Sequence, residues 1–509
     1  MLDLTLLKTF HVDGKEYAEG KNFIEFNGEK AKQLIESGFA KLREKSDEDL
    51  EAEERDKAIL REHDLRADNG FFDEHGKPIP QQIAKCLKKV FEFKTMRDNG
   101  DMYYFNGKFY VHRAETVIEE KCNALLEDKS KTHTISEVVN LIKFDTYVDR
   151  SIAVDGIICL KNGLYNLKTK KLEPFTKDIF ITRQLPVKYI ENAGCQKINK
   201  FISQILSKSD VPVIQELIGY CLHNGYEIQK AAMFIGEGGN GKSTLLNLIK
   251  TLLGQGNVSA ISLQALDTNR FAAASLFGKM ANIYNDLPDA ALHKTGQFKM
   301  LTGGDPITAE KKFGQPFEFT NTAKLLFSCN KVPESLDSTP AFFRRWVFIN
   351  FPNKFEGKEA DKNLLKKLTT PEELSGLFNW AIEGLNRLLE NGDFSNSKST
   401  LEMQDQYERL SSPIAAFVKD CIESSEPYRI DSQGVLLKAD LYKSFVEYCN
   451  HANLPACASN TFGKDLPRHL PSVMAGKTRQ DGRQQPCWRG ISFIVNNEME
   501  AKKEPQQTL

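Results

Sequence analysis

Residues 236–243 read Gly236-Glu237-Gly238-Gly239-Asn240-Gly241-Lys242-Ser243 and match the pattern G-x-x-x-x-G-K-[ST] at every specified position. An apolar run at 231–235 precedes this stretch, and a helical pattern begins at Thr244. Glycines let successive backbone N–H groups turn toward phosphates, and the end of the helix adds partial positive charge. The pattern in this setting predicts a nucleoside triphosphate site in an α/β layer fold; the alternative is a glycine-rich turn before a helix.

The loop assigns a role to each of its polar residues. Lys242 is expected to reach the β- and γ-phosphates of ATP, and the Ser243 hydroxyl to ligate Mg²⁺. The residues expected to contact the nucleotide are Gly236, Gly238, Gly239, Asn240, Gly241, Lys242, Ser243 and Thr244.

Three downstream segments offer partners for this loop. The apolar run 280–284 leads to Asp286, which could hold Mg²⁺ through water or simply open a turn. The run 324–329 delivers Asn330, which could orient the attacking water or initiate a turn before Pro333. Arg344 and Arg345 precede another strand, and we expect either an arginine finger or an ordinary arginine–carboxylate pair.

Length and charge limit the remaining possibilities. The chain has 509 residues with 68 Lys+Arg against 69 Asp+Glu, so the balance excludes a uniformly basic nucleic-acid coat but not a local patch. None of the 10 cysteines has C-x-x-C spacing, which argues against a zinc ribbon. We find no signal peptide pattern and no apolar run near the roughly 20 residues of a membrane span, and therefore expect a cytoplasmic protein.

Composition and periodicity divide the chain into five parts. We expect a hairpin–helix segment with an acidic linker (1–60), an α+β domain (61–195), an ATPase domain (196–400), a small helical module ending in a strand (410–496) and a disordered tail (497–509). Asn106-Gly107 between two β-rich runs predicts a hairpin, and 157–167 repeats the device.

The order of these motifs resembles a superfamily 3 helicase of the phage, plasmid and poxvirus-type primase–helicase family. The resemblance rests on the phosphate loop, Asn285-Asp286, the Gly-Gly-Asp segment at 303–305, the run 327–333 and Phe343-Arg344-Arg345-Trp346. It extends to 162–189, which looks like the domain preceding such helicases, and to a final module resembling a winged helix. It implies an AAA+-like P-loop core, preceded by an α+β domain and followed by a winged-helix module.

The resemblance also implies roles for individual residues. Asp286 would hold the metal, Asn330 would act as sensor, and Arg344 or Arg345 would serve a neighbouring subunit's ATP. Lys311 and Lys312 would sit on a β-hairpin in the channel of a hexameric ring and grip single-stranded DNA, unless they are simply a solvated hairpin tip. Asn285 departs from the paired acids of many members, and too little chain precedes residue 70 for the family's primase domain.

A local basic cluster lies near the C-terminus, where five residues are candidates for DNA contacts: Lys464, Arg468, Lys477, Arg479 and Arg483. Clustered cations suit phosphates, and the alternative of a merely solvated surface is equally compatible with these residues alone.

Together these features predict an ATP- and Mg²⁺-dependent, ring-forming DNA helicase of replication that acts on single-stranded DNA and forked duplexes. A separate primase or polymerase is an expected partner. An origin-binding initiator or loading scaffold is the first alternative, and a small-molecule phosphotransferase is the second.

Overall fold

The computed structural model describes residues 70–149, 156–312, 314–355, 361, 363–423, 427–452, 454–480 and 483–493, together with five short strands before residue 43. These strands are β1 (Leu4–Leu6), β2 (Phe10–Val12), β3 (Lys15–Tyr17), β4 (Asn22–Phe23) and β5 (Ala40–Leu42). β2 and β3 pair as an antiparallel hairpin, as expected for this region. The helix expected in the segment 1–60, the acidic linker and the tail at 497–509 lie outside the described residues.

The chain divides into two units, the first holding residues 1–95, 101–106 and 111–147. Its helices are α3 (Pro80–Val90), α4 (Ala114–Leu126) and α5 (Thr132–Asp145). The accompanying sheet has the order β8-β7-β6-β9, formed by β6 (Phe93–Met96), β7 (Met102–Phe105), β8 (Tyr110–His112) and β9 (Tyr147–Val148). β7 and β8 confirm the hairpin predicted around Asn106-Gly107.

The second unit begins with a small antiparallel sheet of β10 (Ile157–Leu160), β11 (Gly163–Asn166) and β12 (Lys171–Glu173). The register pairs Ile157 with Asn166, which confirms the second predicted hairpin.

A parallel five-stranded sheet is the centre of the second unit. Its order is β14-β15-β18-β13-β19, formed by β13 (Ala231–Ile235), β14 (Val258–Ser259), β15 (Ala281–Tyr284), β18 (Lys324–Cys329) and β19 (Trp346–Asn350). β13 is a continuous apolar run, and β15, β18 and β19 are mostly apolar, which is typical of parallel strands covered on both faces. The strand predicted at 231–235 is therefore present as β13.

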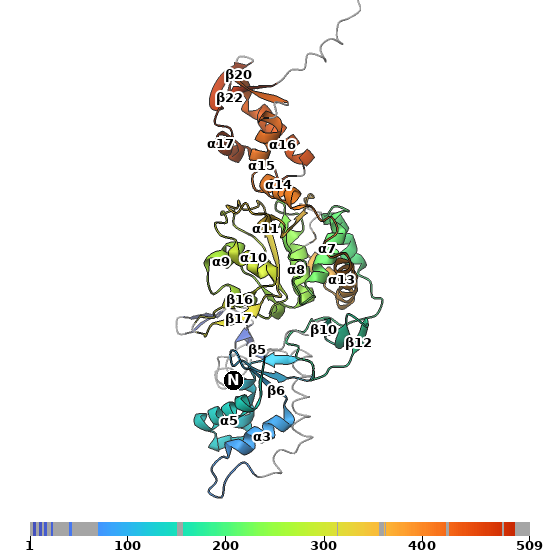
Figure 1. Ribbon diagram of the computed structural model, residues 1–509, viewed down its shortest axis with the longest axis vertical. Coiled ribbons are helices and arrows are strands. Elements are labelled where there is room, and N and C mark those ends of the chain that lie inside the picture. The colour runs from blue at the N-terminus through green and yellow to red at the C-terminus, as the bar shows by residue number, and fades with distance from the viewer. Residues whose placement is uncertain are drawn as a thin grey trace, which may run out of the picture. The chain divides into compact units, whose positions relative to one another are not determined.

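Alternation along β13 sends side chains into two separate cores. Phe234 packs into the core formed with α6 (Gln196–Ile205), α7 (Asp210–Tyr220), α8 (Lys242–Leu253), α12 (Leu364–Leu368) and α13 (Pro371–Asn391). Met233 packs into the other, with α9 (Leu263–Thr268), α10 (Gly296–Gly303), α11 (Pro340–Phe343), α14 (Thr400–Ser411) and the hairpin of β16 (Pro306–Ala309) and β17 (Phe317–Thr320). Figure 1 shows α7 and α13 packed side by side near α8.

The C-terminal part has a core of its own. A three-stranded antiparallel sheet of order β20-β22-β21 joins β20 (Tyr428–Leu437), β21 (Met474–Gln480) and β22 (Arg483–Phe493). Between β20 and β21 the chain forms α16 (Lys438–Ala452) and α17 (Ser459–His469), and α15 (Pro413–Phe417) leads in. The rings of Phe445 and Phe462 stack at 4.6 Å between centroids, and Trp488 is buried beside them.

Within the described residues, no helix is both long and apolar enough to cross a membrane.

A fully buried lysine begins β18. Lys324 Nζ donates to the carbonyl oxygens of His223 (2.8 Å) and Thr322 (2.9 Å) and lies 4.4 and 4.8 Å from the ring centroids of Tyr220 and Tyr226. Among the described residues, no carboxylate forms an ion pair with this ammonium. Burial lowers the pKa of Lys324 to about 7.

We predict that Lys324 makes stability rise with pH. Between pH 7 and the ordinary lysine pKa, the unfolded chain holds a proton at this site that the folded chain has lost, so the free energy of unfolding increases with pH. The free energy of unfolding of the wild type, measured with urea, should increase by about 1–2 kcal/mol more than that of Lys324→Met between pH 7 and 8.5. The exposed control Lys443→Met should keep the wild-type slope, and parallel curves for the wild type and Lys324→Met would contradict the assignment.

Candidate nucleotide-binding site

The loop between β13 and α8 has the backbone that its glycines suggest. Gly236, Gly239 and Gly241 have φ values of +155°, +76° and +89°, and Gly241 is the N-cap of α8. At Gly241 a Cβ atom would also lie 2.7 Å from Ile205 Cγ2. The first N–H groups of α8 have no partner within the helix, so this end of α8 can donate to an anion.

Lys242 is buried beneath the loop and bonded to it. Its ammonium donates to Glu237 O (2.8 Å), to Asn240 Oδ1 (3.2 Å) and to Gly236 O. All three partners are uncharged oxygens, and no described carboxylate forms an ion pair with Lys242. A buried ammonium of this kind gains most from an anionic ligand such as a phosphate.

Asn240 leaves a second group unsatisfied in the loop. Its Oδ1 accepts from the Lys242 backbone N–H at 3.3 Å, while its buried Nδ2 has no hydrogen-bond partner among the described residues. An unpaired buried donor costs about 1–3 kcal/mol, which an acceptor oxygen of a ligand would recover. The loop therefore fits the phosphates of ATP by charge and by donor supply.

The metal ligands predicted from the sequence fit magnesium only together with a nucleotide. Ser243 lies exposed in the first turn of α8, and Asp286 is exposed just beyond β15. No group of three or more His, Cys, Asp or Glu residues that could hold a metal occurs in the described part of the chain. Mg²⁺ usually takes one or two protein oxygens and completes its shell with phosphates and water, as this pair would require.

The strand order brings the predicted polar residues to one edge of the sheet. β18 pairs with β13 on one side and with β15 on the other, so Asn330 follows the strand that lies between the loop and Asp286. Carboxyl ends of parallel strands meet at the same edge, which is where open α/β sheets bind ligands. Burial lowers the pKa of Lys242, and Cys329 and Asp286 oppose this shift, which agrees with their proximity.

The two predicted finger arginines lie at the opposite edge, before β19. Arg345 is buried: its Nε donates to Thr302 Oγ1 at 3.0 Å and its Nη1 to Ala341 O. Arg344 is exposed, and its Nη2 donates to Gln229 Oε1 at 2.9 Å. Both arginines bond within their own chain, and Arg344 is the one whose side chain is exposed to another molecule.

The lysines predicted to grip DNA lie where the sequence placed them. Lys311 and Lys312 are exposed in the connection between β16 and β17. Lys311 Nζ lies 5.9 Å from the Phe317 ring centroid.

The C-terminal basic residues are also exposed. Lys464 and Arg468 lie on α17, where Arg468 pairs with Asp465 at 2.9 Å. Lys477 and Arg479 lie on β21, and Arg483 begins β22. β21 and β22 pair as an antiparallel hairpin, whose turn residues 481 and 482 lie outside the described residues. All five candidates thus belong to one small module.

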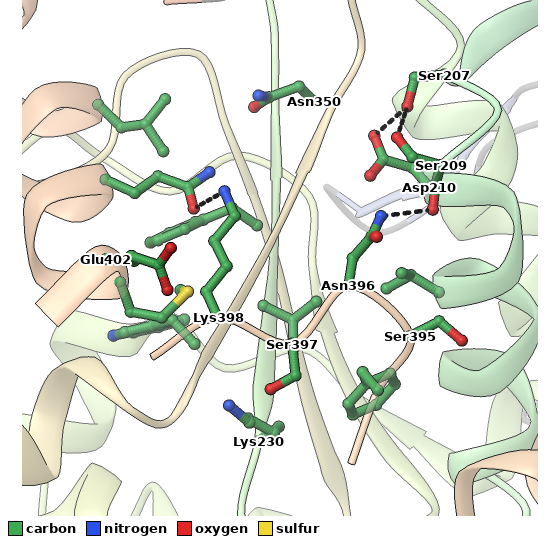
Figure 2. A pocket seen from close by; sticks show the side chains of 18 of the residues that line it. Ser207, Ser209, Asp210, Lys230, Asn350, Ser395, Asn396, Ser397, Lys398 and Glu402 are labelled. Atoms are coloured by element: carbon green, nitrogen blue, oxygen red, sulfur yellow. Dashed lines mark hydrogen bonds between the residues drawn. The ribbon is translucent and has the colours of Figure 1, made fainter. Parts of the chain in front are cut away.

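A separate cavity of about 830 Å³ follows the outer edge of β19 and includes none of the predicted nucleotide contacts. Figure 2 shows Asn396, on the loop that carries Ser395 to Lys398, donating through its Nδ2 to the Ser209 carbonyl oxygen at 2.8 Å. Lys230 and Asp393 contribute opposite charges to its lining, 4.0 Å apart. This mixture of charges does not indicate a particular ligand.

Sequence reasoning missed one contact at the predicted metal site. Lys250 Nζ lies 3.2 Å from Asn285 Oδ1, next to Asp286. The spacing of Ser243, Asn247 and Lys250 on one helix face is the signal that could have revealed it.

We predict that Gly241→Ala destabilises the fold by about 1–3 kcal/mol, because alanine is strained at positive φ and its Cβ would press on Ile205. Gly238→Ala is the matched control, since a Cβ there meets nothing within 4 Å, and it should stay within about 0.5 kcal/mol of the wild type. Urea unfolding measures both changes. Equal stability of the two variants would contradict the loop geometry.

Comparisons with known proteins match two parts of the chain. The family described as "D5 N terminal like" matches residues 10–207, and a "Family of unknown function (DUF5906)" matches residues 234–345. Among curated proteins, "Putative helicase L207/L206" of Acanthamoeba polyphaga mimivirus is 29% identical over 224 residues, and "Putative helicase 121R" of Invertebrate iridescent virus 3 is 23% identical over 220.

These matches are partial. They cover 42% and 40% of this chain, and the chain spans about a quarter of each viral relative, 23% in both cases. Among solved structures, "The A form apo structure of NrS-1 C terminal region-CTR" aligns with 82% of this chain and 100% of that one, at 13% identity and a TM-score of 0.43. A TM-score at that level does not establish a common fold. The sequence similarity is therefore to viral proteins named as helicases.

Proposed function

We propose that this protein is an ATP-dependent DNA helicase of viral, phage or plasmid replication, of the superfamily 3 type. The observation that carries the proposal is the buried Lys242 ammonium, bonded only to uncharged oxygens in a glycine loop at the N-terminus of α8. The strand order supports it, because Asp286 and Asn330 follow strands whose carboxyl ends share the edge with that loop. The similarity to viral proteins named as putative helicases supports a nucleic-acid substrate.

In this proposal the loop and the ends of the neighbouring strands share the work, and Asp286 has two tasks. Lys242 and the N–H groups of α8 bind the phosphates, and Ser243 with Asp286 holds Mg²⁺, which neutralises charge on the phosphates when bound. Asn330 orients the attacking water at the γ-phosphate. Asp286 is the favoured base because Asn285 cannot accept a proton from that water.

The position of Arg344 is the observation that supports a ring of subunits. It precedes β19 at the amino edge of the sheet, whereas the loop follows β13 at the carboxyl edge. From the amino edge, Arg344 would contact the ATP bound to a neighbouring subunit. We therefore propose a homo-oligomeric ring, with a hexamer as the simplest form.

DNA contacts are assigned to two exposed basic regions. Lys311 and Lys312 on the β16–β17 hairpin would follow single-stranded phosphates in the ring's channel as point charges. The C-terminal module has the helix and strand order of a winged helix, so α17 would supply Lys464 and Arg468, and the β21–β22 hairpin Lys477, Arg479 and Arg483.

A second candidate, an origin-binding scaffold that uses ATP only to assemble, would share the loop and the basic module. It differs in one measurable property, because its ATPase would be indifferent to single-stranded DNA and it would not separate strands. A small-molecule phosphotransferase is disfavoured, because the exposed basic residues of the C-terminal module have no task in such a reaction.

We predict that the wild type hydrolyses ATP in the presence of Mg²⁺ and displaces a strand from a forked duplex. Single-stranded DNA should increase its rate of ATP hydrolysis. Lys242→Ala should abolish ATP binding and reduce hydrolysis by about 10²-fold or more, because the γ-phosphate loses its charge partner. Hydrolysis unaffected by this change would exclude the loop as the site. DNA-independent hydrolysis without strand displacement would favour the scaffold.

We predict that Lys311→Ala with Lys312→Ala retains basal hydrolysis within about twofold, since both lysines lie on a hairpin that packs into a different core from α8, but loses strand displacement by about tenfold or more. Fluorescence strand separation on the forked duplex measures this loss. The matched control Lys398→Ala with Lys443→Ala removes two lysines elsewhere and should unwind normally. Undiminished unwinding by the hairpin variant would remove the channel role.

A further inference from the structure

The contact between Lys250 and Asn285 lies beside the predicted metal ligand. Asn285 is the first residue beyond β15 and immediately precedes Asp286. Lys250 Nζ, from the third turn of α8, lies 3.2 Å from Asn285 Oδ1. The helix that begins at the glycine loop is thus tied to the end of the strand that precedes Asp286.

Ser243, the predicted metal ligand, and Lys250 lie on the same face of α8. Lys250 follows Ser243 by seven residues, with Asn247 between them at the fourth, and this spacing aligns side chains along one helix face. Helical side chains also lean toward the helix N-terminus, which directs the Lys250 ammonium back toward the loop.

The chemistry of the pair fixes the orientation of the amide. A lysine ammonium has three donors and no acceptor, so the Asn285 atom facing it must be the carbonyl oxygen. The NH₂ group then points away from Lys250, and an amide NH₂ donates hydrogen bonds but does not ligate a cation. Asn285 Oδ1, the atom that could ligate Mg²⁺, already faces the Lys250 ammonium, and this positive charge would repel a metal ion at that oxygen.

We propose that Lys250 is a positioning residue of the nucleotide site, which holds Asn285 as a hydrogen-bond donor and leaves Asp286 as the single protein carboxylate available to Mg²⁺. This inference rests on the proposed ATP site. It explains how an amide at this position is compatible with a metal-dependent reaction: the ammonium would neutralise an acid there, so a second carboxylate would add little while Lys250 is present.

The test measures the Mg²⁺ dependence of nucleotide binding rather than turnover. A fluorescent, non-hydrolysable ATP analogue is titrated onto the full chain at increasing Mg²⁺, for Asn285→Asp, Lys250→Met and the double variant. With Asn285→Asp alone, the new carboxylate pairs with Lys250, and the Mg²⁺ concentration for half-saturation should move by less than about threefold. In the double variant the carboxylate is released, and that concentration should fall by about tenfold.

Two controls complete the design. Lys250→Arg with Asn285→Asp keeps a cationic donor and should show the same Mg²⁺ concentration for half-saturation as Asn285→Asp alone. Lys443→Met with Asn285→Asp removes a lysine elsewhere and should likewise show no tenfold fall in that concentration. Thermal melting checks that each variant is folded. In hydrolysis, Lys250→Met should lower kcat by about fivefold with little change in analogue affinity, because the Asn285 donor is no longer oriented.

The outcomes separate this inference from the proposal beneath it. A wild type that binds no analogue at any Mg²⁺ concentration would overturn the ATP site and this inference with it. Wild-type binding with equal Mg²⁺ shifts in Asn285→Asp and the double variant would overturn only the role of Lys250, as would an unchanged kcat in Lys250→Met.

Discussion

The parallel pairing of β13 with β18 is the constraint on which the predicted site depends. It places the phosphate loop beside Asn330, and the further pairing of β18 with β15 brings Asp286 to the same edge. Because every strand of this sheet runs in one direction, the residues that precede the strands collect at the other edge. Arg344 is among them, so one topological fact assigns the loop and the arginine to opposite edges of the subunit.

Local patterns in the sequence predicted local structure well. The strand at Ala231–Ile235, the hairpin at Asn106-Gly107 and the one at 157–167 all depend on neighbouring residues, and each is present. The loop glycines were equally readable, because positive φ at Gly241 is a property of a single residue. Residue roles at the site stay predictions, since no property of the chain alone demonstrates a reaction.

Contacts between distant segments could not be read from the sequence. Nothing around Lys324 distinguishes it from a surface lysine, yet it is buried against Tyr220 and Tyr226, about a hundred residues away. The separation of Arg345 from Arg344 has the same origin: the two are adjacent in the chain, but only Arg345 turns inward to Thr302. Tertiary packing decides which of two adjacent side chains is buried, and the sequence alone does not show which one.

The bonds that Lys242 makes within its own loop have a consequence for turnover. The ammonium already has three oxygen partners, so departure of the products would not strand a bare charge in a dry setting. The loop oxygens would take the place of water around the ammonium. On binding, phosphate oxygens of a nucleotide would replace the loop oxygens, and on release the loop oxygens would return. Under the proposed function, such an exchange would reduce the free-energy difference between the loaded and empty states and so favour release of the products.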